Sequence, residues 1–319
     1  MRGEGGTGLV EDADRWERSS GRTCYRPQCD PSSRVVRTAL AILIRNPPFG
    51  DVEVIPLQSG SSGNCVFVRV GDTRLIFDAG ISGKKAAERL SRYGHRLTDC
   101  DALVISHDHS DHVASMPSIS RRYELPVAIT EATLDAVAGR RDVGTLFGVR
   151  HFRAGEPFAV GDAIIHTIRT PHDARDGVCF VVEDRRDGRR FGLMTDLGHV
   201  FGELRDWMPT LDAVLIESNY DDGMLFGGPY PRRLKERISG PRGHLSNVDA
   251  AKLIRDHAGD SLRWVCLGHL SDKNNSPVFA THTARKYLPR HLTVHVADRY
   301  DAIPPMRLSK RPAVARALF

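Results

Sequence analysis

The chain has 319 residues and a formal net charge of +5, and 40% of its residues are hydrophobic. This length allows one large or two small domains with a hydrophobic core of their own. The mildly basic charge suits a partner that carries phosphates. It is also common among enzymes with other substrates, so the charge alone does not define the function.

No apolar run reaches the roughly 18 residues that a membrane-spanning helix needs, and no signal-peptide pattern is evident. The six cysteines show neither CxxC pairs nor regular spacing, which predicts neither a disulfide framework nor a thiolate zinc cluster. They are Cys24, Cys29, Cys65, Cys100, Cys179 and Cys266. We therefore expect a cytoplasmic protein with reduced cysteines and no membrane partner.

The composition divides the chain into three parts. Residues 1–49 are rich in Gly, Arg and Ser, and we expect a disordered N-terminal extension there, with a targeting or partner-binding arm as the alternative. A single folded domain is expected over residues 50–306. Residues 307–319 are expected to form a basic C-terminal tail.

Strand patterns begin at residue 52 and recur along the chain. Strands are expected at 52–57, 64–70, 73–80, 102–106, 126–130, 163–170, 178–184, 190–196, 264–270 and 292–297. Helices are expected at 84–93, 231–238, 247–258 and 276–288. Strands followed by mixed βα units occur in both halves. The pattern predicts an α/β fold with two mixed β-sheets packed face to face and flanked by helices, an αβ/βα sandwich.

The most informative candidate ligands lie in the segment ISHDHSDHV at residues 105–113, at the end of an apolar strand. It carries His107, His109, Asp111 and His112. Imidazole and carboxylate groups suit zinc and similar divalent ions, and one short loop can direct ligands toward two neighbouring metals. A histidine-rich surface loop is the alternative, but three His and two Asp within six residues favour metal binding.

Two metals need more ligands than this loop offers, and suitable residues follow later strands. His172, Asp196 and His269 each come just after an expected strand. Each residue alone is a weak signal, because a lone polar residue there is more often a cap or a satisfied polar group. Their recurrence at the same structural position indicates a shared site.

The order Asp78, HxHxDH, His172, Asp196 and His269 resembles the five motifs of the metallo-β-lactamase superfamily. Longer stretches resemble its YycJ/WalJ branch, whose members are described as metal-dependent DNA exonucleases or cyclic phosphodiesterases. These stretches are SGSSGN at 59–64, LIESNYDDGML at 215–225, GGPYPRRLKERISGPRGHLSN at 227–247 and LGHLSDKNN at 267–275. The resemblance covers about residues 52–297.

This resemblance implies a ligand set for two divalent ions, zinc or alternatively manganese. His107, His109 and His172 would hold the first metal, Asp111, His112 and His269 the second, with Asp196 bridging and Asp78 orienting the ligands. Two such ions can clamp the attacking and leaving oxygens of a displacement, so hydrolysis would need no covalent intermediate. We assign catalytic roles to Asp111 and His244.

Three features bear on the substrate. The SGSSGN turn either cradles a phosphate through Ser61, Ser62 and Asn64 or is a simple hairpin turn. A basic cluster before His244 either contacts phosphates or lies on a solvated helix face; it consists of Arg232, Arg233, Lys235, Arg237 and Arg242, of which Arg232 and Arg233 are the phosphate-binding candidates. His244 resembles the extra histidine of the ribonuclease Z branch and would protonate the leaving oxygen; alternatively, it is a polar residue at a helix entry.

The expected function is a metal-dependent phosphodiesterase, a 5′-directed DNA exonuclease linked to DNA repair, with DNA as partner and a homodimer as a possible assembly. The alternative is a small-molecule hydrolase of the same fold, acting on a ribosyl cyclic phosphate, a thioester or a lactone. A non-catalytic regulatory module is a third hypothesis, which the complete ligand set opposes.

Overall fold

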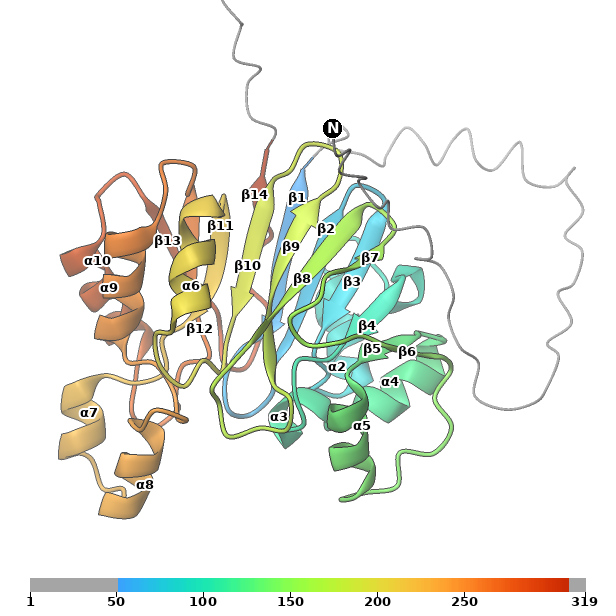
Figure 1. The fold of residues 1–319 in the computed structure, drawn as a ribbon, viewed down its shortest axis with the longest axis horizontal. Helices are drawn as coiled ribbons and strands as arrows, with labels where there is room; N and C mark the ends of the chain where they lie inside the picture. Colours follow the sequence, from blue (N-terminus) through green and yellow to red (C-terminus); the bar gives the residue numbers. More distant parts are fainter. Residues whose placement is uncertain (1–50, 310–319) are drawn as a thin grey trace, which may run out of the picture.

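Two seven-stranded β-sheets form the centre of the protein in the computed structural model, which describes residues 51–309 (Figure 1). The first sheet has the strand order β14-β1-β2-β3-β4-β5-β6 and the second β13-β12-β11-β10-β9-β8-β7. The expected N-terminal extension at 1–49 and residues 310–319 of the expected tail lie outside the described residues. The predicted sandwich of two mixed sheets is confirmed.

The strands of the first sheet are β1 Val52–Gln58, β2 Cys65–Val70, β3 Thr73–Phe77, β4 Ala102–Val104, β5 Val127–Ile129, β6 Val149–His151 and β14 Met306–Leu308. Those of the second are β7 Phe158–Val160, β8 Ala163–Arg169, β9 Val178–Asp184, β10 Arg190–Met194, β11 Ala213–Glu217, β12 Trp264–Gly268 and β13 Thr293–Val296.

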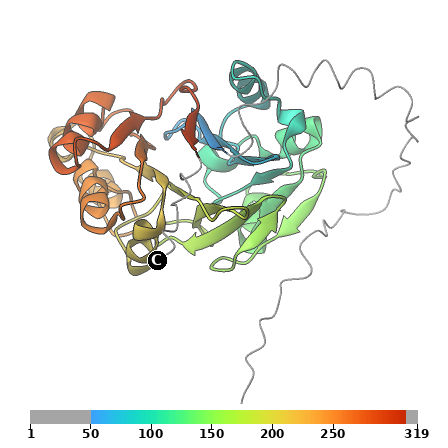
Figure 2. The same ribbon diagram turned by 90° about the horizontal axis from the view of Figure 1, so that it is seen from above.

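Helices cover the outer faces of both sheets (Figure 2). Along the first half run α2 Gly83–Ser91, α3 Ser110–Val113, α4 Met116–Tyr123 and α5 Glu131–Ala138. Along the second run α6 Gly202–Trp207, α7 Asp222–Gly227, α8 Arg232–Ile238, α9 Asn247–His257 and α10 Pro277–Tyr287. Within residues 51–309, no helix has both the length and the apolar character to cross a membrane.

The apolar runs of the strands follow from burial on both faces. In β1, Val52 and Val54 belong to the core between the sheets, while Ile55 and Leu57 belong to the core beneath the helices of the first half. Alternate residues of a strand point to opposite faces, so a strand covered on both sides reads as a continuous apolar run.

Four strands were not among the expected ones. β6, β7 and β14 have three residues each, too few to show a period of two. β14 pairs antiparallel with β1, and Arg307 donates hydrogen bonds to Glu53 across this pair. The expected domain boundary at 306 therefore falls inside a strand, and the folded domain continues through Leu308. β11 lies between β10 and β12, fully buried.

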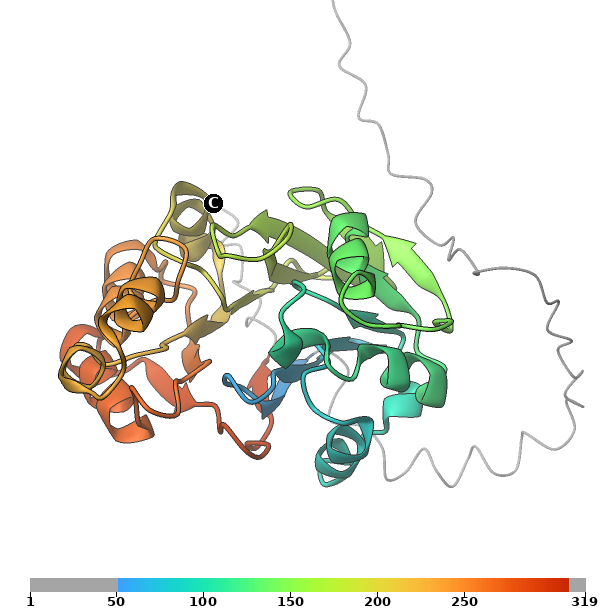
Figure 3. The ribbon, with the colours of Figure 1, turned by 90° about the horizontal axis from the view of Figure 1, so that it is seen from below.

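The topology brings the carboxyl ends of several strands to one edge of the sandwich, the lower edge in Figure 1. β3 runs parallel to β4, and β11 runs parallel to both β10 and β12. The loops that follow these strands therefore meet at one place. Seen from below, the short helix α3 lies between the two halves at this edge (Figure 3).

A close backbone approach locks the first-sheet loops together at the same edge. The backbone N–H of Asn64 donates to the carbonyl of Asp111, and that of Gly80 donates to the carbonyl of Asn64. A Cβ added at Gly80 would lie 1.7 Å from the Asp111 carbonyl oxygen. Only glycine fits here, which explains the Gly in the FDAG motif.

Candidate metal centre

Three site residues adopt left-handed backbone conformations close to the ends of strands. Asp78 follows β3 with φ 61°, Asp196 follows β10 with φ 57°, and His269 follows β12 with φ 52°. Asp and His tolerate this region better than most residues, but it still costs free energy, and such strain is typical of functional sites. The strand ends thus turn these side chains sharply toward one point.

The first ligand cluster contains His107, His109 and His172, whose ligand atoms lie within 4.8 Å of one another. His172 Nε2 lies 3.3 Å from His109 Nδ1. The opposite nitrogen, His172 Nδ1, is 2.8 Å from the carbonyl of Gly243, and His107 Nδ1 is 2.9 Å from Ser106 Oγ. These outer contacts fix the rings of His172 and His107 and leave Nε2 of each facing the cluster.

The second cluster contains Asp111, His112 and His269, again within 4.8 Å. Asp111 Oδ2 lies 3.5 Å from Nε2 of both histidines. His112 Nδ1 is 2.8 Å from Asp78 Oδ2, and Asp78 Oδ1 also accepts from the backbone N–H of Ser106. Asp78 therefore lies behind the cluster, at the position expected for a residue that orients a ligand.

Asp196 lies between the two clusters. Its Oδ1 is 3.6 Å from His172 Nε2, and its Oδ2 is 3.2 Å from His112 Nε2. Oδ1 also lies 3.3 Å from His269 Nδ1, so the Asp196 carboxylate lies near histidines of both clusters, as expected for a bridging ligand. Burial disfavours the charged form of Asp196, but the nearby charges of His269 and His112 outweigh this and hold its pKa well below the ordinary value.

Several buried atoms in this centre lack a hydrogen-bond partner. Among the described residues they include His107 Nε2, His269 Nε2 and Asp196 Oδ2, all of which face the clusters. Buried polar atoms without partners are costly and rare. Burial alone would lower the pKa of His269, yet the Asp196 carboxylate raises it to about 10. The centre thus attracts positive charge, and its donor set fits divalent cations.

Glu217 is a site residue that the sequence interpretation missed. It ends β11, is fully buried, and its Oε1 lies 2.6 Å from His244 Nδ1 and 3.2 Å from His269 Nδ1. Its Oε2 accepts hydrogen bonds from the backbone of Leu197 and Leu245. Two signals were available: Glu217 ends an apolar run, like the other ligand candidates, and it lies in the LIESNYDDGML stretch that resembles the YycJ/WalJ branch.

An open pocket of about 340 Å³ leads to this centre. Its lining residues come from both halves of the chain, and they include ligand candidates, polar residues and two arginines. They are Ser61, His109, Ser110, Asp111, Arg140, His172, Asp173, Asp196, Arg237, His244 and His269. His244 thus lines the same pocket as the ligand candidates.

Of the five residues expected to contact phosphate, the structure places only Ser61 in the lining of the pocket. Ser61 lines the pocket, whereas Ser62 donates to the Arg299 carbonyl. Asn64 is buried behind the pocket, where its side-chain oxygen accepts from the N–H of Gly60. Arg232 and Arg233 are exposed on α8 and are not among the lining residues, and Arg232 pairs with Glu236.

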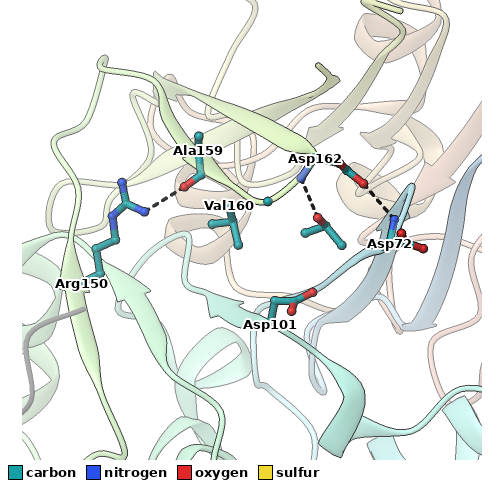
Figure 4. Close-up of a pocket in the computed structure, with 8 residues that line it drawn as sticks. Asp72, Asp101, Arg150, Ala159, Val160 and Asp162 are labelled. Carbon is teal, nitrogen blue, oxygen red and sulfur yellow. Dashed lines mark hydrogen bonds between the residues drawn. The ribbon is translucent and has the colours of Figure 1, made fainter. Parts of the chain in front are cut away.

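A second hollow, of about 430 Å³, lies where β7 and β8 meet the first sheet (Figure 4). Its polar groups are engaged with one another: Asp162 Oδ2 accepts from the N–H of Asp72, and Arg150 donates to the carbonyl of Ala159. No histidine or cysteine is among its described lining residues. This hollow therefore marks the junction of the two sheets, and the candidate catalytic residues line the other pocket.

A two-sheet sandwich with paired histidine–carboxylate clusters at its strand ends defines the protein as a metal-dependent hydrolase of the metallo-β-lactamase fold. The comparisons agree: the family described as "Beta-lactamase superfamily domain" matches residues 73–302. The chain belongs to this superfamily.

Two curated relatives place the chain within one branch. It is 34% identical to "Exodeoxyribonuclease WalJ" of Streptococcus pneumoniae over 221 residues, covering 69% of this chain and 81% of that protein. It is 30% identical to "Exodeoxyribonuclease YycJ" of Bacillus anthracis over 234 residues, covering 73% and 87%. The fold resembles that of the metallo-β-lactamase fold protein YhfI of Bacillus subtilis, with a TM-score of 0.60, 16% identity and coverage of 81% and 99%. The resemblance to the YycJ/WalJ branch is thereby confirmed.

Proposed function

We propose that this protein is a metal-dependent phosphodiesterase that acts as a DNA exonuclease, 5′-directed and linked to DNA repair. The observation that carries the proposal is the pair of ligand clusters joined by Asp196, with His244 beside them in an open pocket. The WalJ and YycJ relatives, both called exodeoxyribonucleases, support DNA as the substrate class.

The donor set defines which metals are proposed. His107, His109 and His172 would hold one divalent ion and Asp111, His112 and His269 the other, with Asp196 shared. These ligands are nitrogen and carboxylate oxygen, which suits zinc first and manganese second. When bound, two such ions supply positive charge that stabilises the attacking and leaving oxygens of a phosphodiester.

The chain's own residues supply proton transfer and orientation. Glu217 holds Nδ1 of His244, so Nε2 remains to donate a proton to the leaving oxygen. Burial disfavours ionisation of Asp111, but the charges of His112 and His269 hold its pKa well below the ordinary value. A carboxylate that stays ionised is a weak base, so we propose that Asp111 contributes to catalysis mainly as a ligand.

The test is cleavage of defined substrates by the purified, metal-replete protein. Single- and double-stranded DNA labelled at the 5′ or the 3′ end should be shortened progressively, and early release of the 5′ label would establish the proposed polarity. RNA and bis-p-nitrophenyl phosphate are run in parallel. Hydrolysis of the small ester without any cleavage of DNA would refute the nuclease and favour the small-molecule hydrolase. Elemental analysis would identify the bound metal.

The cellular context is a further part of the proposal. We propose that the enzyme works in the cytoplasm on damaged or processed DNA ends. A strain that lacks the gene should then be more sensitive to DNA-damaging agents, and wild-type sensitivity would contradict the repair role. The homodimer stays a prediction, which sedimentation of the purified protein would check.

A further inference from the structure

Two arginines reach the metal pocket from opposite sides. Arg140 follows the end of α5, and Arg237 lies on α8. These helices lie on either side of α3 at the lower edge of the sandwich (Figures 1 and 3). Both arginines line the pocket that contains His109 and Asp196, and their side chains are 54% and 65% exposed. Two cationic groups therefore face the site while remaining accessible.

Each arginine is held by an aspartate that adjoins a metal-ligand candidate in the sequence. Arg140 pairs with Asp108, which lies between His107 and His109. Arg237 donates from Nε and Nη2 to Asp173 Oδ2, at 3.0 and 2.8 Å, and Asp173 follows His172. The position of each guanidinium is thus tied to a loop that builds the metal centre.

These contacts leave donors free for a ligand. Arg237 uses only Nε and Nη2, and Arg140 uses Nε toward the Ala136 carbonyl and Nη2 toward Asp108. In both side chains Nη1 has no hydrogen-bond partner among residues 51–309. A guanidinium has five N–H donors, so one that is already held by a carboxylate can still bind a phosphate oxygen, with less entropy to lose on binding.

The pocket also continues past Arg237. An adjacent hollow of about 360 Å³ is lined by two arginines, two carboxylates and a turn: Arg237, Arg242, Asp173, Glu236, Gly240 and Pro241. A polynucleotide bound at the metal centre could therefore extend along α8 into this hollow, whereas a small ester would occupy only the first pocket. The Arg237–Asp173 pair is partly exposed and contributes little to stability. The Arg140–Asp108 pair includes a buried carboxylate that also accepts from the N–H of Arg175, so it helps to hold the ligand loop as well.

We propose that Arg140 and Arg237 bind the phosphates on either side of the scissile one, so that the site selects a polynucleotide over a small phosphodiester. This inference rests on the proposed nuclease function and names residues that determine its specificity. Guanidinium–phosphate contacts are strong, charge-assisted hydrogen bonds. Losing one should therefore weaken use of a polynucleotide by about 10–100-fold.

The test compares two substrates for each variant. kcat/KM is measured on a 5′-phosphorylated single-stranded dT12 oligonucleotide and on bis-p-nitrophenyl phosphate, for the wild type, Arg140→Gln, Arg237→Gln and the double variant. Arg255→Gln is the matched control, because Arg255 pairs with Asp256 on α9 and does not line either hollow. Salt titrations are run with the oligonucleotide.

Each single variant should lose about 10–100-fold on the oligonucleotide, mainly through KM, and far less on the ester. The salt dependence of oligonucleotide use should fall by a slope of about 0.7 for each arginine removed. Arg255→Gln should match the wild type on both substrates. Arg140→Lys and Arg237→Lys keep the positive charge but lose the paired N–H donors of the guanidinium. They should recover the salt slope but only part of the activity.

Equal losses on both substrates, or undiminished use of the oligonucleotide, would overturn the role of these arginines. Metal content and melting temperature are measured for every variant; a loss traced to either one would also overturn the role, because it would make the arginines structural. Failure of the proposed function has a different signature: the wild-type protein itself would hydrolyse the ester and neither bind nor cleave the oligonucleotide.

Discussion

His244, which lines the pocket, is hydrogen-bonded to the fully buried Glu217, with 2.6 Å between His244 Nδ1 and Glu217 Oε1. The same carboxylate lies 3.2 Å from His269 Nδ1 and accepts two backbone hydrogen bonds through Oε2. Burial disfavours the charged form of Glu217, but the His244 contact outweighs this and lowers its pKa below the ordinary value. Glu217 therefore connects the proposed acid to a metal-ligand candidate.

Replacing His244 by Ala should lower turnover on DNA by about 10²–10⁴-fold, the usual range for a positioned acid. The loss should be smaller on bis-p-nitrophenyl phosphate, because p-nitrophenolate leaves readily without protonation. Metal content should stay at the wild-type level, since both clusters remain complete. The ratio of the two activities checks the prediction, and an unchanged ratio would assign His244 a structural role.

Glu217→Gln should cause a loss of turnover similar to that of His244→Ala, because the amide no longer fixes the imidazole with Nδ1 as the donor. The double variant should lose little more than His244→Ala alone, since groups that act as one unit are not additive. We also expect a fall of about 1–3 kcal/mol in the free energy of unfolding, from the buried hydrogen bonds that are weakened. Fully additive losses would contradict positioning.

Asp196→Ala should abolish hydrolysis and lower the metal content, because its carboxylate lies near histidines of both clusters. Elemental analysis of the purified variant checks this directly. The exposed Asp256→Ala on α9 serves as control and should keep both metals. Two metals and near-normal turnover in Asp196→Ala would show that the ligand assignment is wrong.

Protonation of Glu53 should destabilise the protein in acid. Burial disfavours its charged form, but hydrogen bonds from His95 and Arg307 outweigh this and lower its pKa to about 2. A lowered pKa in the folded state contributes stability above the unfolded pKa, near 4.5, and this contribution disappears as the pH falls toward 2. Allowing for partial solvent screening, we expect about 1–2 kcal/mol.

Urea unfolding of the wild type and of Glu53→Gln between pH 7 and pH 2.5 measures this contribution. The difference in unfolding free energy between the two proteins should be constant above about pH 5 and shrink below it. A difference that is independent of pH would show that the contacts with His95 and Arg307 do not lower the pKa of Glu53 in the folded protein. The experiment also reports on the junction of β1 and β14.

The Arg232→Gln and Arg233→Gln variants separate contacts close to the site from those further along the substrate. Both residues are exposed on α8 outside the pocket, so any phosphate they contact lies beyond it. Their replacement should weaken use of long single strands and leave a tetranucleotide nearly unaffected. Arg237→Gln should weaken both, and a tetranucleotide dependence on Arg232 would contradict this arrangement.

The sequence by itself determined the fold class and most of the candidate metal centre. The HxHxDH loop keeps four ligand candidates within six residues, so no tertiary information is needed to recognise them. His172, Asp196 and His269 were recognisable because each follows an apolar strand, and strands that are buried on both faces leave long apolar runs.

Only the tertiary structure decided which polar groups face the centre. Glu217 ends β11, a strand that was not expected from the sequence, and its role depends on β11 lying between β10 and β12, a pairing between distant segments. On α8, Leu234 and Ile238 lie on one face of the helix, but neither is fully buried. This short apolar stripe could not show that Arg237 faces the pocket and Arg232 does not. The packing of α8 beside the His172 loop places Arg237 at the pocket and leaves Arg232 in solvent.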